Sequence, residues 1–132
     1  MSTRKVAIIV ANGGKDSAYK VFNIANAAAA MDSEVAVFFT FEGVKLIHKE
    51  TYGNLPLPAA MAGLEASFKA NNVPAIPELV SMAQEMGVKF IACQMTLDLM
   101  GISPEQLVDG VEVGGAASFL AFAYDADVTL TF

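Results

Sequence analysis

The hydrophobic residues of the chain fall into short, nearly unbroken runs separated by stretches with helical spacing. An apolar run without polar alternation is typical of a strand that is buried on both faces of a parallel sheet. The first runs have this character, whereas the last one alternates apolar and polar residues. Strands are therefore expected at residues 5–11, 35–40, 88–92, 111–113 and 127–132.

The stretches between these runs predict helices. Long helices are expected at residues 16–31, 76–86 and 114–125, and short ones at about 59–69, from Thr96 to Gly101 and from Ser103 onward. Asp16 or Ser17, Thr96 and Ser103 are the residues expected to cap helix N-termini, because their side-chain oxygens accept hydrogen bonds from free backbone N–H groups. A short amphipathic piece at residues 44–49 follows the second strand.

Strands that alternate with helices indicate a parallel sheet with right-handed crossovers and helices on both faces. We therefore predict an α/β fold, a three-layer α/β/α sandwich with a mainly parallel five-stranded sheet, in a single domain over residues 1–132. The least regular part is residues 50–74, which glycines and prolines interrupt. A loop of this length in a compact domain is usually a lid, a binding loop or an interface.

The composition of the chain favours some classes of protein and argues against others. Hydrophobic residues make up 55% of the 132 residues and charged residues only 17%, which favours a homo-oligomer that buries part of this apolar surface. The net charge of −6 and eight scattered basic residues argue against nucleic-acid binding. The chain shows no secretory signal and no run long enough to cross a bilayer. One cysteine cannot form an internal disulfide, so a cytoplasmic setting is expected.

That cysteine, Cys93, directly follows the predicted strand at residues 88–92 and precedes a short helix. Ligands bind at the carboxyl edge of the sheet in α/β proteins, and helix N-termini there offer free N–H groups. A thiol at this place should ionise more easily than a free one. A lone cysteine is also often a small buried core residue, and position alone does not decide between the two. Met95 and Met100 beside it are either core filler or a polarizable wall suited to sulfur-bearing ligands.

A second candidate is the turn at residues 12–17, which reads Asn12-Gly13-Gly14-Lys15-Asp16-Ser17. It follows a strand and opens a helix, which suits an anion held by backbone N–H groups. It is not a Walker A loop, but it resembles the Ser-Gly-Gly-x-Asp-Ser pyrophosphate loop of ATP pyrophosphatases, with Asn12 in place of the first serine. An adenine-nucleotide or anion-binding module is therefore one alternative, and a tight turn that needs glycine is another.

His48 and Glu42 are further candidates near the sheet edge. His48 is the only histidine and would suit the role of a base for Cys93, although a histidine on a short amphipathic segment beside Lys49 is more often simply exposed. Glu42 has no partner at a spacing that singles it out for acid–base chemistry. One cysteine and one histidine without a carboxylate cluster do not make a metal site, so no metal and no cofactor are expected.

Several stretches together resemble the DsrE-like (DsrE/DsrF-like) sulfur-relay family, and in particular its small stand-alone members. These are residues 8–16, 37–43 (VFFTFEG), 92–102 (ACQMTLDLMGI) and 114–116 (GGA). The resemblance covers nearly the whole chain and is most specific around Cys93. Where relatives often carry an aromatic residue between Phe41 and Gly43, this chain has Glu42.

The resemblance implies a parallel α/β/α fold, assembly into homo-oligomers and a cysteine that carries sulfur as a persulfide or thiosulfonate. This cysteine falls on Cys93. The partners that it implies are TusA-type sulfur carriers and rhodanese-like sulfurtransferases. The shell around the sulfur is expected to comprise Asn12, Gly13, Gly14, Thr40, Gln94, Met95 and Thr96. The resemblance thus leads us to expect a sulfur carrier or sulfurtransferase rather than a turnover enzyme, and a non-catalytic oligomeric interaction subunit is a further alternative.

Overall fold

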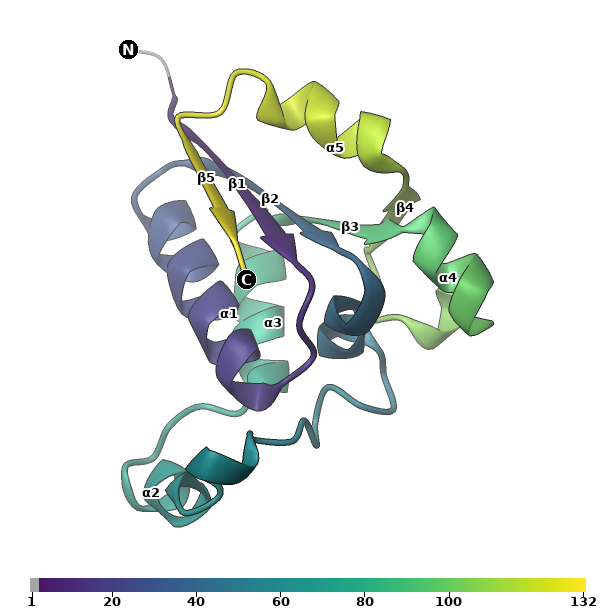
Figure 1. Cartoon of the computed structure of the whole chain (residues 1–132). Helices are drawn as coiled ribbons and strands as arrows, with labels where there is room; N and C mark the ends of the chain where they lie inside the picture. The colour runs from purple at the N-terminus through teal and green to yellow at the C-terminus, as the bar shows by residue number, and fades with distance from the viewer. Residues whose placement is uncertain (1–2) are drawn as a thin grey trace.

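The computed structural model describes residues 3–132 and contains one sheet of five parallel strands (Figure 1). The strands are β1 (Lys5–Val10), β2 (Glu34–Phe39), β3 (Lys89–Cys93), β4 (Glu112–Gly114) and β5 (Val128–Thr131), in the spatial order β4-β3-β2-β1-β5. Each pair of neighbours is parallel. The sheet therefore has β1 and β2 near its centre, and its carboxyl ends share one edge.

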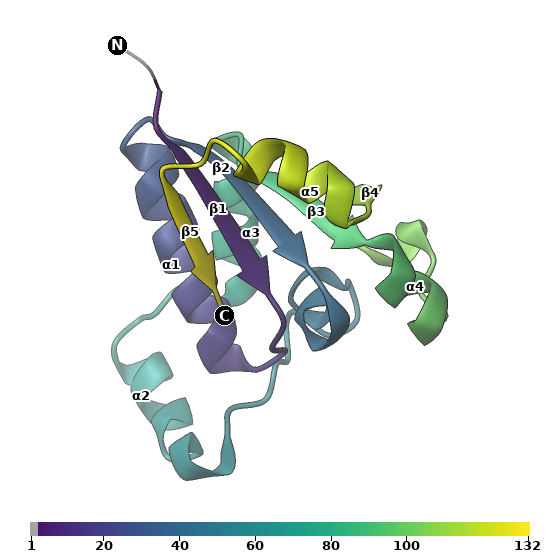
Figure 2. The ribbon, with the colours of Figure 1, turned by 45° about the horizontal axis from the view of Figure 1, so that its top comes forward.

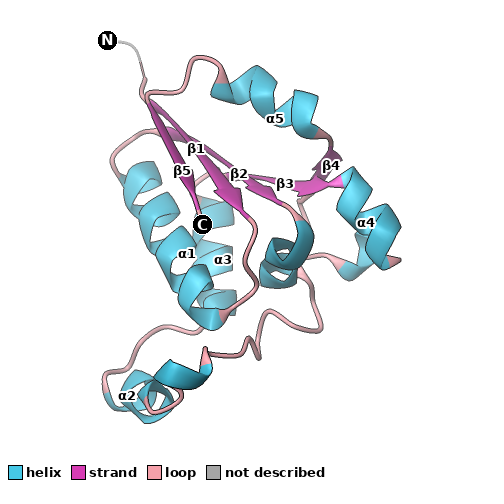
Figure 3. Cartoon of the chain, in the orientation of Figure 1, coloured by secondary structure: helices cyan, strands magenta, loops and turns pink. Residues whose placement is uncertain are grey.

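Helices cover both faces of this sheet (Figure 3). The α-helices are α1 (Lys15–Ala30), α2 (Leu64–Ala70), α3 (Ile76–Glu85), α4 (Gln94–Met100) and α5 (Ala116–Ala123); the 3-10 helices are η1 (Phe41–Ile47), η2 (Ala59–Met61) and η3 (Pro104–Gln106). The predicted three-layer α/β/α architecture is confirmed. Among residues 3–132, no helix combines the length and the apolar character that a membrane span requires.

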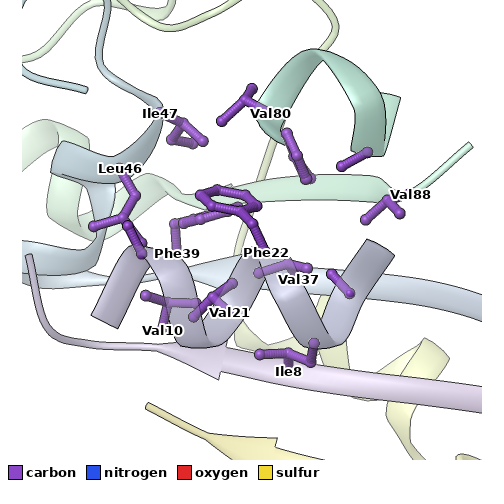
Figure 4. Packing of buried hydrophobic residues seen from close by; sticks show 14 of the residues in the cluster. Ile8, Val10, Val21, Phe22, Val37, Phe39, Leu46, Ile47, Val80 and Val88 are labelled. Carbon is purple, nitrogen blue, oxygen red and sulfur yellow. The ribbon is translucent and has the colours of Figure 1, made fainter. Parts of the chain in front are cut away.

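The main core lies between the sheet and the helices α1 and α3 (Figure 4). Its largest side chains are Phe22 of α1, Phe39 of β2 and Phe90 of β3, each less than 2% exposed. Their ring centroids lie 5.4–6.4 Å apart, a range in which aromatic pairs add stability beyond their buried area. Residues with even numbers on β1 and β3 and odd numbers on β2 thus fill this side.

The opposite face carries a smaller core under α5 (Figure 2). It consists of five buried residues from three strands and this helix: Ala7, Phe38, Ile91, Cys93 and Phe119. The rings of Phe38 and Phe119 stack with their centroids 5.3 Å apart. One short helix covers much less of the sheet than α1 and α3 do, so the carboxyl edge on this side is the thinnest part of the sandwich.

The segment around α2 lies apart from the sheet in both views (Figures 1 and 2). None of the α2 residues is buried, and its main anchors are made by Phe68, whose ring stacks on Tyr19 at 4.9 Å and lies under the Lys15 ammonium at 4.7 Å. Lys15 also pairs with Glu65 at 3.0 Å. The helix predicted at residues 59–69 is broken into η2 and α2, with Gly63 between them.

Two predicted helix caps are wrong. The N-cap of α1 is the extended Gly14 rather than Asp16 or Ser17, and the N–H of Lys15 is satisfied by the Pro56 carbonyl at 2.8 Å, so no side-chain cap is needed. The helix expected to begin at Thr96 begins two residues earlier, with Cys93 at the N-cap. Thr96 lies inside α4, because its hydroxyl serves a tertiary contact rather than a cap.

Two glycines hold the loops at the carboxyl edge close together. A Cβ on Gly43 would lie 2.1 Å from the Val10 carbonyl oxygen, and one on Gly13 would lie 2.6 Å from the Glu42 carbonyl oxygen. In the same region the Thr40 N–H donates to the Val10 carbonyl at 2.9 Å. The turn after β1 and the turn after β2 therefore touch through their backbones, which only glycine permits.

We expect Gly43→Ala to destabilise the protein by about 3 kcal/mol, because the added methyl group would overlap a carbonyl that is held in the sheet. The matched control is Gly63→Ala, since a Cβ at Gly63 meets nothing within 4 Å. We expect this variant to change the free energy of unfolding by less than about 1 kcal/mol. Urea denaturation measures both, and equal stabilities of the two variants would contradict the contact.

Candidate functional site around Cys93

Cys93 lies at the carboxyl end of β3, where the strand passes directly into α4. On one side it is paired in register with Gly114 of β4. On the other side the last pair of the ladder is Phe39 with Ala92, so the next residue, Thr40, lies beside Cys93. Because side chains alternate between the faces of a sheet, Thr40 and Cys93 share the face that α5 covers.

The thiol is largely buried, with 7% of Cys93 exposed. It packs in the small core with Phe38, Ile91 and Phe119, so the burial that the sequence left open for this cysteine is found in the structure. The reason is the close seat of α5 on β4, where a Cβ on Gly114 would lie 3.0 Å from the Ser118 hydroxyl.

Thr96 is completely buried and joins the end of β2 to α4. Its Oγ1 accepts a hydrogen bond of 2.9 Å from the N–H of Phe41 and lies 3.4 Å from Oγ1 of Thr40. Since this oxygen accepts from Phe41, its own hydrogen is free to point to Thr40 or to the sulfur of Cys93. The two threonines form a small hydroxyl cluster beside the thiol.

Two opposing influences act on the ionisation of Cys93. Burial raises the pKa of the thiol, but hydrogen-bond donors lower the pKa by more, so that it lies below the ordinary value for cysteine. The donors are the hydroxyl and N–H of Thr96, the hydroxyl of Thr40 and the N–H of Met95. The site therefore favours the thiolate, which is the nucleophilic form, through oriented dipoles on a buried sulfur.

Phe41 has a backbone conformation that is unusual for its residue type. Its φ angle of 48° lies in the left-handed region, which costs free energy for a residue with a bulky side chain. This turn directs the Phe41 N–H at Thr96 and leaves 49% of the residue exposed. This contribution could not be predicted from the sequence, because side-chain patterns do not show where a backbone N–H points.

The other residues predicted to surround the sulfur do not all place their side chains beside Cys93. The Met95 side chain is 54% exposed, although its N–H acts on the thiol. The Gln94 amide donates to Asp98 within α4 at 2.9 Å and thereby points along the helix surface. Gly13 packs against the backbone of Glu42, in the turn after β1, which lies two strands from Cys93. In the structure Gly13 thus supports the turn after β2.

The turn at residues 12–17 is already engaged in internal contacts. The Lys15 N–H donates to the Pro56 carbonyl at 2.8 Å, and the Lys15 ammonium pairs with Glu65 at 3.0 Å. These are the groups that would hold a phosphate. The Asp16 carboxylate lies near Gly14, 2.6 Å from the position of a Cβ there, and an acidic group at this place opposes anion binding.

Glu42 forms an ion pair with Lys45 within η1. His48 is only 8% exposed, so the expectation of an exposed histidine is wrong; it forms an antiparallel bridge with Leu107, and its Nδ1 accepts a 3.1 Å hydrogen bond from the Glu50 N–H. No hydrogen bond joins His48 to Cys93 within residues 3–132, and that part of the chain holds no cluster of His, Cys, Asp and Glu suited to a metal ion.

The sequence matches the model of the DsrE/DsrF/DrsH-like family at residues 2–62 and 57–131. It is 38% identical to the sulfur carrier protein DsrE2 of Allochromatium vinosum, over 98% of this chain and 99% of that protein. It is also 34% identical to the uncharacterized protein YrkE of Bacillus subtilis, over 97% of this chain and 96% of that protein.

Two solved structures share the fold. The YchN protein of E. coli superposes with a TM-score of 0.65 at 24% identity and covers 98% of this chain. MTH1491 of Methanobacterium thermoautotrophicum, a protein of unknown function, superposes with a TM-score of 0.68 at 19% identity and also covers 98% of this chain. At this level of identity the likeness concerns the fold alone.

We expect the alkylation rate of native Cys93 to rise with pH around a midpoint below that of a free cysteine, since only the thiolate reacts and donors lower its pKa. Thr96→Val should reduce the rate at neutral pH about tenfold, because a hydrogen bond to a charged group is worth ~1.5–3 kcal/mol. Thr96→Ser retains the hydroxyl and should keep most of the rate.

The control for general effects is Thr129→Val, on the exposed face of β5 at the far edge of the sheet. Rates are measured with iodoacetamide under conditions where circular dichroism shows each variant folded. If Thr96→Val and Thr129→Val react alike across the pH range, the threonine hydroxyl has no part in activating the thiol.

Proposed function

The chain belongs to the DsrE/DsrF/DrsH-like family, and from this premise we propose that it is a sulfur carrier that holds sulfur on Cys93 and exchanges it with partner proteins. The single observation that carries the proposal is the place of Cys93, at the N-cap of α4 and beside the paired hydroxyls of Thr40 and Thr96. Four donors from Thr96, Thr40 and Met95 favour a negative charge on this sulfur. A sequence identity of 38% to a sulfur carrier protein over nearly the full length supports the same role.

Loading of the thiolate requires no metal or redox cofactor when the donor already carries sulfane sulfur. With thiosulfate, the Cys93 thiolate attacks the sulfane sulfur, the S–S bond of thiosulfate breaks and sulfite leaves with the electron pair. The product is a persulfide whose terminal sulfur bears the negative charge. Tetrathionate instead yields a thiosulfonate on Cys93, with thiosulfate as the leaving group. The threonine hydroxyls would donate hydrogen bonds to either anionic cargo.

Release requires a second molecule, because the chain contains no other cysteine that could attack the persulfide. A partner thiolate attacks the terminal sulfur, the sulfur moves to the partner and Cys93 leaves as the thiolate. The donors that stabilise the thiolate also make Cys93 a good leaving group. TusA-type carriers and rhodanese-like sulfurtransferases are the partners that we propose.

We expect Cys93→Ser to abolish the mass gain that the protein shows after incubation with thiosulfate, tetrathionate or polysulfide, because serine cannot form these sulfur adducts. The wild-type chain should gain one sulfur or one thiosulfonate group, and dithiothreitol should reverse the gain. Intact-protein mass spectrometry measures both. An absence of cysteine-dependent mass gain with all three donors would refute the proposal, and Thr129→Val serves as the loading-competent control.

The surface around the carboxyl edge suits a protein partner. Three large apolar side chains are exposed on α4 and at the start of η1, the elements that follow β3 and β2: Leu99 at 68%, Met95 at 54% and Phe41 at 49%. Monomeric proteins seldom gather exposed apolar side chains beside a reactive group without a binding role. The flexible Met95 side chain can move aside when a partner cysteine approaches, which reconciles a buried thiol with protein-to-protein transfer.

We expect Leu99→Lys to slow sulfur transfer to a TusA-type acceptor by about tenfold or more while loading from tetrathionate stays unchanged, since a charge at the interface costs docking energy but does not touch the sulfur. Met31→Lys is the matched control, because Met31 is 73% exposed at the end of α1. A loss of transfer that is equal in both variants would contradict docking at this surface.

The remaining expectations concern the turn at residues 12–17, the assembly of the chain and its cellular setting. Nothing in the structure favours nucleotide binding by residues 12–17, whose polar groups are engaged internally. The homo-oligomer stays a prediction. A second copy would cover the exposed apolar side chains of Leu120 in α5, Tyr124 at its C-cap and Val128 in β5. Sedimentation velocity tests whether the chain assembles. A reducing, cytoplasmic setting would keep the lone thiol free, which cell fractionation would check.

A further inference from the structure

A cavity of about 240 Å³ lies between η1, the turn after it and the C-terminal end of α4. Its walls are mainly apolar, formed by Phe41, Val44, Met100 and Ile102, with His48 among the lining residues. This volume admits a small organic molecule or one large side chain. The cavity does not contain Cys93, and the sulfur chemistry does not use it.

The polar group that distinguishes this cavity is His48. The residue is more than nine-tenths buried, and its Nδ1 accepts a hydrogen bond of 3.1 Å from the Glu50 N–H. A ring nitrogen that accepts carries no hydrogen, so the ring hydrogen lies on Nε2. Nε2 has no hydrogen-bond partner among residues 3–132, nor is it sealed from solvent. The lining of this cavity therefore includes a residue with one donor that has no partner in the described part of the chain.

We propose that this cavity is a second binding site, for a small uncharged molecule with an apolar body and one hydrogen-bond acceptor such as a carbonyl. Small-molecule sites combine apolar walls with a few polar groups that fix the orientation of the ligand, and Nε2 of His48 would be that group, because no atom of the described residues accepts its hydrogen. The apolar walls of Phe41, Met100 and Ile102 accommodate the rest of the molecule.

The charges at the cavity select against an ionised ligand. Lys45 is already paired with Glu42, and the Glu50 carboxylate at the rim repels anions. Burying a carboxylate among apolar walls without a free cation is costly. A cation would face the donor hydrogen of His48 and be repelled by it. An uncharged ligand is the class that avoids both penalties.

The test uses the fact that His48 is the only histidine, so its ring signals are unique in a nitrogen and proton NMR spectrum. Benzamide is the probe, because it combines a ring with a carbonyl. We expect saturable shifts of the His48 ring signals with benzamide, and at least about tenfold weaker binding of benzoate, which has the same outline but a negative charge. Acetamide, which lacks the ring, should produce no saturable shift.

Two variants locate the effect. Ile102→Phe should fill the cavity and abolish benzamide binding, whereas Ile24→Phe, on the exposed side of α1, should leave it unchanged. His48→Phe should weaken binding about tenfold as seen on the Met100 methyl signal. The proposal is overturned if benzamide causes no saturable shift, if benzoate binds equally well, if Ile102→Phe retains binding, or if the spectrum shows the hydrogen on Nδ1. These outcomes are independent of whether Cys93 carries sulfur.

Discussion

The candidate site depends on the parallel register between β2 and β3. Phe39 pairs with Ala92, so continuing the register by one residue brings Thr40 beside Cys93 on the same face. The register is fixed by the apolar side chains that both strands bury, since a slip of one residue would move every side chain to the other face. Below the sheet the rings of Phe39 and Phe90 meet at 5.4 Å. The core thus determines which hydroxyl lies beside the thiol.

A second constraint acts on the turn after β2, which contributes further groups to the site. The carboxyl end of β2 is held on β1 through the close approach of Gly43 and the Val10 carbonyl, and this contact directs the chain so that the Phe41 N–H reaches Thr96. Burial raises the pKa of Cys93, and the groups that lower it are hydrogen-bond dipoles of Thr96, Thr40 and Met95 rather than a cation. Fixed dipoles suit a carrier, because they favour an anionic sulfur without forming a tight ion pair that would hold it back.

Much of this arrangement could be predicted from the sequence, and the remainder has identifiable causes. The strand preceding Cys93 and the helix following it were readable from apolar spacing, and so was the order of the elements. Thr96 was expected to contribute a cap and instead lies buried inside α4, because its hydroxyl is required by the Phe41 N–H. The order of the strands in the sheet decides which loops contact each other, and this order cannot be read from the sequence. The burial of His48 likewise results from its bridge to Leu107, a contact between residues far apart in the chain.

The elements that carry the site lie apart from residues 57–62, where the two matched parts of the family model overlap. The alignments with the two curated relatives run over 157 and 154 positions, more than the 132 residues of this chain, so the relatives contain segments that are absent here. The two matched parts of the family model meet at residues 57–62, in the loop that leads to α2. None of the α2 residues is buried, and the helix lies apart from the sheet (Figure 1). The elements that hold Cys93, Thr40 and Thr96 lie outside this junction. An insertion at residues 57–62 would therefore alter the periphery without changing the register on which the thiol depends.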